Sequence, residues 1–279
     1  MRVVAADSPE FPPKVLRDIK GLIFDFDGTL FDNELFPFYL IAANPLDLLR
    51  VWKERLVRTS FAGCDYASPE EYYKAFFSAF GKACLCSPER IRNWYFSRYM
   101  PRMVRVVKKH YNARPGAREL FHNFDVSVND KYPVPRVAVY SDYPFLKERM
   151  EALGLTTSAN IPLYGPDSFG AQKPASRPFL NIAGDLGVPP EQVLVIGDRE
   201  ETDGIGAFKA GMRFFFLNTK QKRYSQLDPN RYPRKDCPKG PALVMYAGVW
   251  DDLIKLLQSY VPKQNFVPVS KILNKKVCL

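Results

Sequence analysis

Four aspartates are spaced so that they could form one acidic site. Asp25 and Asp27 end a short apolar run, and Asp198 follows another such run with Asp203 five residues later. In an open parallel sheet, ligands bind at the edge where the carboxyl ends of the strands meet. Carboxylates that converge there repel one another unless a cation lies between them or one is protonated. An all-oxygen set without histidine or cysteine suits a hard cation, Mg²⁺ first.

A plainer interpretation is that aspartates at strand ends only cap turns, and for any one of them alone that interpretation is the better one. For the set together, the cation site is favoured. Ser141 and Lys173 are expected at the same edge. A hydroxyl with neighbouring backbone N–H groups can hold a phosphate oxygen, and a lysine can neutralise both an aspartate and a phosphoryl group. Taken singly, they would be a strand-end hydroxyl and a surface lysine.

Five short apolar, β-prone runs could carry these residues. Continuous apolar runs are typical of parallel strands that are covered on both faces. Helix-like stretches lie between the later runs, and three of them end at a glycine. The pattern predicts a doubly wound α/β domain in which the strands have the order 5-4-1-2-3, with the first strand central. The runs are Gly21–Asp25, 137–141, 161–164, Val193–Gly197 and Arg213–Leu217.

More than 100 residues separate the first two of these runs, and the intervening sequence reads as helical. Ser68 and Ser87 each precede Pro-Glu, which is a helix-start signal with proline at the first helical position. We therefore predict an all-helical inserted domain over 33–113 and an α/β core over 1–32 and 114–279. The helices of the inserted domain are expected at 45–59, 70–82, 89–100 and 102–111.

Positive charge is concentrated in two parts of the chain. The net charge is +10; residues 33–113 hold 13 Lys/Arg and 7 Asp/Glu, and the C-terminal extension, 218–279, holds 12 and 4. A basic surface suits phosphorylated metabolites, nucleic acid or acidic lipid, although it can also be a solvated face without a ligand. The extension reads as an irregular loop over 220–240 and an amphipathic helix over 249–260. Because it lacks an aromatic-basic repeat, we expect it to be structural rather than catalytic or nucleic-acid-binding.

The composition excludes several classes of protein. With 46% hydrophobic and 25% charged residues, the chain is typical of a globular protein rather than a disordered, collagen-like or coiled-coil one. No apolar run approaches the roughly 18 residues of a membrane-spanning helix, and no secretory h-region is present. Five scattered cysteines and two histidines suit neither a disulfide scaffold nor a histidine-rich metal site. We expect a cytoplasmic protein without a membrane partner, and the oligomeric state stays open.

The order and spacing of these residues resemble the four motifs of the haloacid dehalogenase superfamily. The first motif corresponds to Asp25-x-Asp27-Gly-Thr29, the second to Ser141 after its apolar run, and the third to Lys173-Pro-x-x-x-Pro-Phe179. The fourth corresponds to Gly197-Asp198-x-x-x-x-Asp203. The resemblance covers roughly residues 18–217, in which the helical insertion matches a cap domain by position and helical character only. It implies a Rossmann-like core and phosphatase-like chemistry with Mg²⁺.

The resemblance also implies a role for each motif residue. Asp25 would attack phosphorus, and Asp27 would act as general acid and then general base. The metal would be held by the Asp25 and Asp198 carboxylates and the Asp27 backbone carbonyl, with Asp203 supporting that shell or orienting Lys173. Phosphoryl oxygens would be bound by Ser141, Lys173 and neighbouring Asp142, and Thr29 would orient the first-motif loop. Asp142 departs from the pattern, because many relatives carry a neutral residue there.

Of four other functions, Asp27 argues against dehalogenation and phosphonate cleavage, and two remain as alternatives. Hydrolytic dehalogenases and phosphonate-cleaving relatives resemble this chain but lack the second aspartate, and the latter also need a cap lysine, for which Lys53 could be offered. A sugar-phosphate mutase keeps both aspartates, so the sequence excludes it poorly. A nucleic-acid- or acidic-surface-binding protein on the same scaffold would not need the intact aspartate set. The cap residues Arg50, Lys53 and Arg58 could face the cleft and favour a small phosphorylated substrate with a second anionic group, or could form a solvated face.

Overall fold

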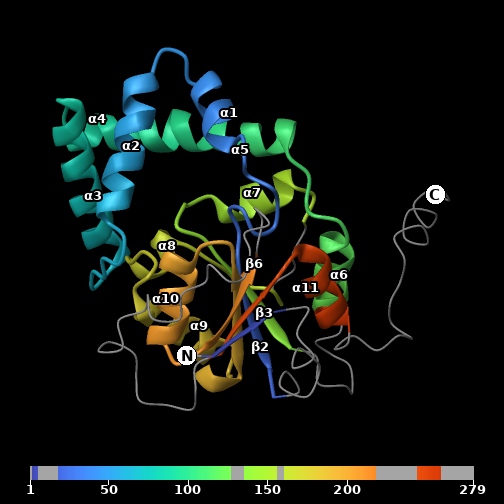
Figure 1. Ribbon diagram of the computed structural model, residues 1–279. Coiled ribbons are helices and arrows are strands. Elements are labelled where there is room, and N and C mark those ends of the chain that lie inside the picture. Colours follow the sequence, from blue (N-terminus) through green and yellow to red (C-terminus); the bar gives the residue numbers. More distant parts are fainter. Residues whose placement is uncertain (1, 6–17, 127–134, 156–159, 218–243, 259–279) are drawn as a thin grey trace.

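A seven-stranded parallel sheet forms the centre of the lower domain in Figure 1. The computed structural model describes residues 2–5, 18–126, 135–155, 160–217 and 244–258. The strand order is β1-β7-β6-β5-β2-β3-β4, so β2 lies inside the sheet between β5 and β3, and it bears Asp25 as its last residue. The strands are β1 Arg2–Ala5, β2 Gly21–Asp25, β3 Arg136–Tyr140, β4 Leu163–Tyr164, β5 Val193–Gly197, β6 Arg213–Leu217 and β7 Val244–Gly248.

The five strands that the sequence predicts lie in the predicted order, and the structure adds two. β7 pairs in parallel with β6, and β1 pairs in parallel with β7 at the sheet edge. The expectation that the extension contributes only a loop and a helix is therefore wrong. The β7 segment reads Val-Met-Tyr-Ala-Gly, and its two small residues weaken the strand signal. The predicted loop 220–240 lies outside the described residues.

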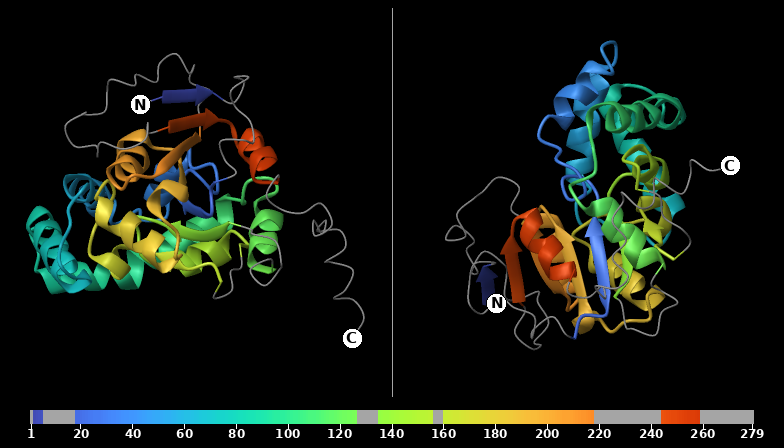
Figure 2. Two further views of the ribbon diagram at one scale, coloured as in Figure 1. Left: turned by 90° about the horizontal axis from the view of Figure 1, so that it is seen from below. Right: turned by 90° about the vertical axis from the view of Figure 1, so that its right-hand side faces the viewer.

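Helices cover both faces of the sheet, which explains why its strands are continuously apolar (Figure 2). One hydrophobic cluster joins one face to α6, α7 and α11, and a second joins the other face to α8, α9 and α10. The helices are α6 Ala117–Val126, α7 Leu146–Ala152, α8 Pro166–Phe169, α9 Ser176–Asp185, α10 Ile205–Lys209 and α11 Trp250–Gln258. Two short turns add a 3₁₀-helical Pro190–Gln192 and a π-helical Glu200–Gly204.

The inserted residues form a helical cap above the carboxyl edge of the sheet (Figure 1). The Ser68 and Ser87 hydroxyls accept from backbone N–H groups three residues later, as their sequence signals predict. The structure adds α1 and joins the last two predicted helices into one continuous path through a π-helical Tyr95–Tyr99. The cap helices are α1 Phe36–Ala42, α2 Leu48–Ser60, α3 Pro69–Cys84, α4 Pro88–Trp94 and α5 Met100–His110. Among the described residues, no helix is both long and apolar enough to cross a bilayer.

The cap is hydrogen-bonded to the loop that carries Lys173. The Gly63 N–H donates to the Lys173 carbonyl at 3.0 Å, and the Gln172 N–H donates to the Cys64 carbonyl at 3.0 Å. Nearby, Asp65 and Ala171 form a single antiparallel bridge. The placement of Lys173 therefore depends on the segment that follows α2.

Removing buried side-chain volume from α11 should destabilise the protein without impairing catalysis. Leu257 is fully buried in the cluster that α11 shares with the sheet. We expect Leu257→Ala to lower the free energy of unfolding by about 2–5 kcal/mol, measured by urea denaturation. Turnover of the folded variant should match the wild type, because the motif residues that were given catalytic roles all lie between Asp25 and Asp203. A folded variant without activity would contradict a structural role for the extension.

Candidate active site

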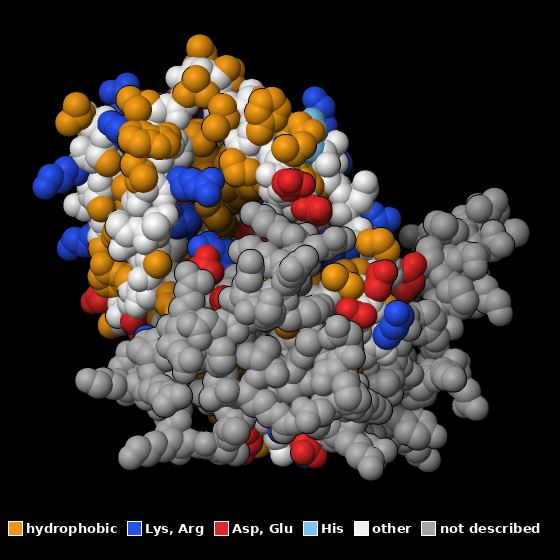
Figure 3. Space-filling model, viewed as in Figure 1, with side chains coloured by type: hydrophobic (Ala, Val, Ile, Leu, Met, Phe, Trp, Pro, Cys, Tyr) orange, Lys and Arg blue, Asp and Glu red, His pale blue; other side chains and the backbone are white. Residues whose placement is uncertain are grey.

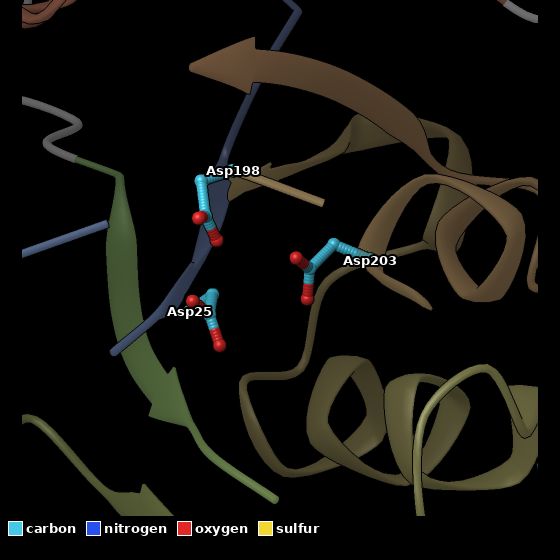
Figure 4. Close-up of side chains that lie close together, drawn as sticks. All are labelled: Asp25, Asp198 and Asp203. Carbon is cyan, nitrogen blue, oxygen red and sulfur yellow. The ribbon is translucent and has the colours of Figure 1, made fainter. Parts of the chain in front are cut away.

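Three carboxylates converge at the carboxyl edge of the sheet (Figure 4). Asp25 ends β2, Asp198 follows β5, and Asp203 lies in the π-helical turn after it. Each contributes an oxygen that lies within 4.8 Å of the others. Because three separate segments supply them, this cluster is a product of the sheet topology rather than of local sequence. The Asp27 carboxylate is not part of the cluster.

Lys173 provides the positive charge within this cluster. Its side chain is 2% exposed, and its Nζ donates to Asp25 Oδ1 at 2.5 Å and to Asp203 Oδ1 at 2.8 Å. Asp142 Oδ1 accepts from the Lys173 backbone N–H at 3.0 Å. Asp142, the acidic residue that departs from the family pattern, thus holds the loop of Lys173 in place, because its carboxylate accepts from the backbone N–H of that loop.

One lysine does not neutralise the three carboxylates of the cluster, of which Asp25 and Asp203 are buried and Asp198 is half-buried. Burial raises the pKa of Asp25 to about 7, a rise that Lys173 reduces and that Asp203 and Asp27 reinforce. Burial also raises the pKa of Asp198 to about 8, and the neighbouring charges of Asp25 and Asp203 add to the rise. Burial alone would lower the pKa of Lys173, but the two aspartates that it contacts raise it well above its usual value. The lysine therefore stays charged. The carboxylates still carry more negative charge than one lysine can balance, so a further cation would be stabilised there.

The chemistry of the cluster fits a divalent metal. Asp198 Oδ1 is buried without a hydrogen-bond partner, so one anionic oxygen is free to coordinate. Gly28 has a φ of +94°, and a Cβ there would lie 2.3 Å from Asp198 Oδ2, so only glycine allows the first-motif loop to approach this closely. Hard carboxylate oxygens without soft ligands are the donor set that Mg²⁺ prefers. Asp25 and Asp198 are the residues best placed to hold it.

Asp27 is held by a buried arginine that the sequence does not reveal. Arg149 from α7 is fully buried, and its Nη1 donates to both Asp27 oxygens at 2.9 and 2.7 Å. The Ser141 hydroxyl donates to Asp27 Oδ2 at 3.0 Å and accepts from Arg149 Nη2 at 2.7 Å. Since the one proton of Ser141 is used on Asp27, this hydroxyl must exchange its partner before it donates to a phosphoryl oxygen. The carboxylate of Asp27 still lines the cleft.

The first-motif loop is fixed from two sides. The Thr29 hydroxyl donates to Asp25 Oδ2 at 3.0 Å, so Thr29 orients the candidate nucleophile itself as well as the loop. Arg114 donates from Nε to the Thr29 carbonyl and from Nη2 to the Gly28 carbonyl, both at 2.9 Å. Arg114 lies where the chain returns from the cap to the core, and its sequence gives no signal of this role.

A cleft of about 1080 Å³ lies between the cap and the acidic cluster. Of the cap cations, the structure places Arg55 and Arg58 at this cleft, and not Arg50 or Lys53. Arg50 pairs with Asp47, and Lys53 donates to the Ala83 carbonyl. Arg50 lies in the first turn of α2 over the Trp94 ring of α4, and Lys53 lies on the side of α2 that faces α3.

Arg55 and Arg58 differ in their burial and in their contacts. Arg58 is buried, pairs with Glu54 at 2.6 Å and donates to the Asp142 carbonyl at 2.7 Å, so it ties the cap to the core. Arg55 is exposed at the cleft. Arg55 is therefore the cap cation best placed to meet a second anionic group on a substrate.

Comparison with known proteins agrees with this geometry. The sequence profile of the haloacid dehalogenase-like hydrolases matches residues 19–211. Glyceraldehyde 3-phosphate phosphatase of Methanopyrus kandleri (strain AV19) is 33% identical over 63 residues, which is 23% of this chain and only 26% of that protein.

Solved structures share the fold at low identity. A 2-haloacid dehalogenase from Pseudomonas syringae pv. tomato DC3000 has a TM-score of 0.53 at 17% identity, over 87% of this chain and 99% of its own. A protein described as a predicted phosphoglycolate phosphatase from Haemophilus somnus 129pt has a TM-score of 0.51 at 19% identity, over 86% and 98%. These likenesses show the fold alone. The profile match covers most of the chain and includes Asp25, Lys173 and Asp203. The chain therefore belongs to the haloacid dehalogenase-like hydrolases.

Proposed function

We propose that this hydrolase is a Mg²⁺-dependent phosphatase that cleaves a small phosphorylated metabolite through an aspartyl-phosphate at Asp25. The observation that carries the proposal is the second aspartate of the first motif, Asp27, whose carboxylate lines the cleft two residues after Asp25. The alkoxide leaving group of a phosphate ester needs a proton, whereas a halide does not. An acid at this position favours phosphoryl chemistry over dehalogenation.

Asp25 is positioned to act as the nucleophile. Thr29 and Lys173 each hold one of its oxygens, which fixes the orientation of the carboxylate. Attack of one oxygen on phosphorus would form the acyl phosphate, and the bond to the leaving oxygen would break with its electron pair going to that oxygen. Lys173 would neutralise charge on both the nucleophile and the phosphoryl group.

Asp27 would carry the proton in both half-reactions. It would protonate the leaving oxygen in the first and take a proton from the attacking water in the second, so that the acyl phosphate is hydrolysed and Asp25 is regenerated. Its contacts with Arg149 and Ser141 hold its carboxylate at the side of the cleft. Bound Mg²⁺, held by Asp25 and Asp198, would neutralise carboxylate and phosphoryl charge.

Replacing Asp27 by asparagine should slow turnover of an alkyl phosphate by about 10²–10⁴-fold, the usual worth of general acid–base catalysis. The amide is close in size to the carboxylate and keeps one oxygen for Arg149, but it removes the charge opposite this buried guanidinium, so a partial loss of stability is expected in a variant that still folds. Steady-state kcat with saturating Mg²⁺ is the measurement, and circular dichroism is the check on folding. Unchanged kcat in the folded variant would remove Asp27 from the mechanism.

The stabilisation that Mg²⁺ gives should grow as the pH rises. The pKa values of Asp25 and Asp198, about 7 and about 8, lie above the ordinary value of 3.8. The metal-free folded protein therefore keeps protons that the unfolded chain has released, and it loses stability as the pH rises toward 8. Mg²⁺ binds the deprotonated carboxylates and offsets this loss. We expect the increase in Tm on adding Mg²⁺ to be larger at about pH 8 than at about pH 6, and an increase that shrinks with pH would contradict this assignment.

A panel of phosphorylated metabolites tests the proposed activity and the substrate class together. We expect Mg²⁺-dependent release of inorganic phosphate, with faster turnover of substrates that carry a second anionic group for Arg55. Phosphate transfer between two positions of a sugar, without release of inorganic phosphate, would instead identify a mutase. Retention on heparin or DNA without any turnover would identify a binding protein.

A further inference from the structure

The outer end of the cap exposes an unusual concentration of apolar side chains. Eight of the ten large apolar side chains that are exposed in the described part of the chain fall within residues 35–56. In Figure 3 apolar atoms gather over α1 and α2 at the top of the molecule. We refer to these residues as the tip surface: Leu35, Phe38, Ile41, Leu46, Leu48, Leu49, Trp52 and Leu56.

The tip surface is not needed to fold the cap. The buried residues of α2 are Val51, Glu54, Val57 and Arg58, and they face the interior of the cap. The apolar residues of the tip surface on the same helix are 49–60% exposed and lie on its opposite side. Contiguous exposed apolar surface of this kind marks a site of interaction with another molecule or a membrane.

The shape of the tip surface favours binding to a lipid bilayer over binding to a second protein. The turn between α1 and α2 is the outermost part of the cap (Figure 1), and Leu46 in that turn is 97% exposed. Phe38 of α1 and Trp52 of α2 are 65% and 58% exposed. A convex projection that ends in a fully exposed leucine and is flanked by aromatic rings suits insertion into a lipid interface.

Cations flank the tip surface. Arg55 is exposed on α2, and α5 ends in Lys108, Lys109 and His110, all exposed. The His110 ring stacks on Tyr39 of α1 at 3.9 Å, which places this basic end beside the tip surface.

The acidic groups near the tip surface do not cancel this charge. Asp47 pairs with Arg50 and Arg102, and Glu54 pairs with Arg58 in the cap interior. Asp32 and Glu34 are exposed next to Leu35, so they reduce the positive charge of Arg55, Lys108 and Lys109 without cancelling it. An apolar surface with a net cationic rim is complementary to anionic lipid headgroups.

We propose that the tip surface docks this protein on an anionic lipid bilayer, with Leu46 and Trp52 inserted and the basic rim on the headgroups. The proposal is independent of the phosphatase assignment. It differs from the sequence-based expectation of no membrane partner, because sequence alone does not show that these leucines lie on the exposed side of α2. The cleft opens next to the tip surface, since Phe36 and Pro37 line it.

Trp52 makes the proposal measurable in the intact protein. The chain has three tryptophans, and Trp94 and Trp250 are only 5% and 6% exposed, so a change in the polarity around Trp52 dominates the fluorescence response. We expect a blue shift and co-sedimentation with phosphatidylcholine vesicles that contain phosphatidylserine. Both should weaken in high salt and with phosphatidylcholine alone, because the rim acts through charge. No binding to the anionic vesicles would overturn the proposal.

A matched pair of leucine variants separates insertion from non-specific effects. Leu46→Asp should weaken partition into the anionic vesicles by about tenfold or more, the value of one buried leucine. Leu85→Asp is the control, because Leu85 is 91% exposed on the cap outside the tip surface, and it should bind as the wild type does. Equal loss in both variants would overturn the proposal. Light scattering that shows self-association, abolished by Leu46→Asp and unaffected by vesicles, would instead assign the tip surface to a second copy of the chain.

Discussion

Asp25→Asn is expected to abolish phosphatase turnover while leaving the protein folded. The amide is neither a nucleophile nor an anionic metal ligand, so kcat should fall by about 10⁴-fold or more. The fold should persist, because the side chain keeps its size and Lys173 keeps its contact with Asp203. Burial already disfavours the charged form of Asp25, whose pKa is raised to about 7, so a neutral amide is tolerated there.

Phosphate release and thermal unfolding are measured on the same preparation of this variant. Asp251→Asn is the matched control, because Asp251 is an exposed aspartate in the first turn of α11. The control should retain wild-type turnover. Phosphate release by folded Asp25→Asn at the wild-type rate would eliminate the aspartyl-phosphate from the account.

Lys173→Met should reduce both activity and stability. The variant leaves the buried carboxylates of Asp25 and Asp203 without their cation. Removing one partner of a buried ion pair costs about 3–5 kcal/mol of unfolding free energy, and losing a charged donor at the reacting group costs about 10²–10³-fold in kcat. Urea denaturation without metal and steady-state kinetics with Mg²⁺ measure the two effects.

The loss of stability in Lys173→Met should be largest at high pH. Since the pKa values of Asp25 and Asp203 are raised, lowering the pH protonates the carboxylates that have lost their partner. Lys147→Met is the control, because Lys147 is exposed on α7 and has no proposed role in the site. A stable and active Lys173→Met would show that the buried lysine is dispensable.

The strand order and the acidic cluster were predictable because both follow from simple patterns. Five continuous apolar runs specify a sheet covered on both faces, and a carboxylate after β2 and β5 must then lie at one edge. β1 and β7 were not predictable, because one is a four-residue edge strand and the other ends in Ala247 and Gly248. Edge strands need less apolar sequence than central ones.

The buried arginines were not predictable from the sequence. In the sequence, Arg149 is an ordinary charged residue within a predicted helix. In the structure it is fully buried and contacts Asp27, Ser141 and the Tyr143 carbonyl. Its environment arises where α7 meets the ends of β2 and β3, so it depends on tertiary packing. Arg114, which is half-buried, likewise contacts the Thr29 carbonyl 85 residues away, and Arg58 contacts the Asp142 carbonyl 84 residues away although it also pairs with nearby Glu54. Long-range partners leave no local spacing to detect.

The most direct test of the phosphatase assignment compares two leaving groups on one preparation of the enzyme. Release of inorganic phosphate from an aryl phosphate and release of halide from a 2-haloacid are measured with Mg²⁺ and with a chelator. The account predicts phosphate release that requires Mg²⁺ and depends on Asp25, and no halide release. Halide release without phosphate release would contradict it, because a halide leaves without a proton and Asp27 would then have no proton to donate in the reaction.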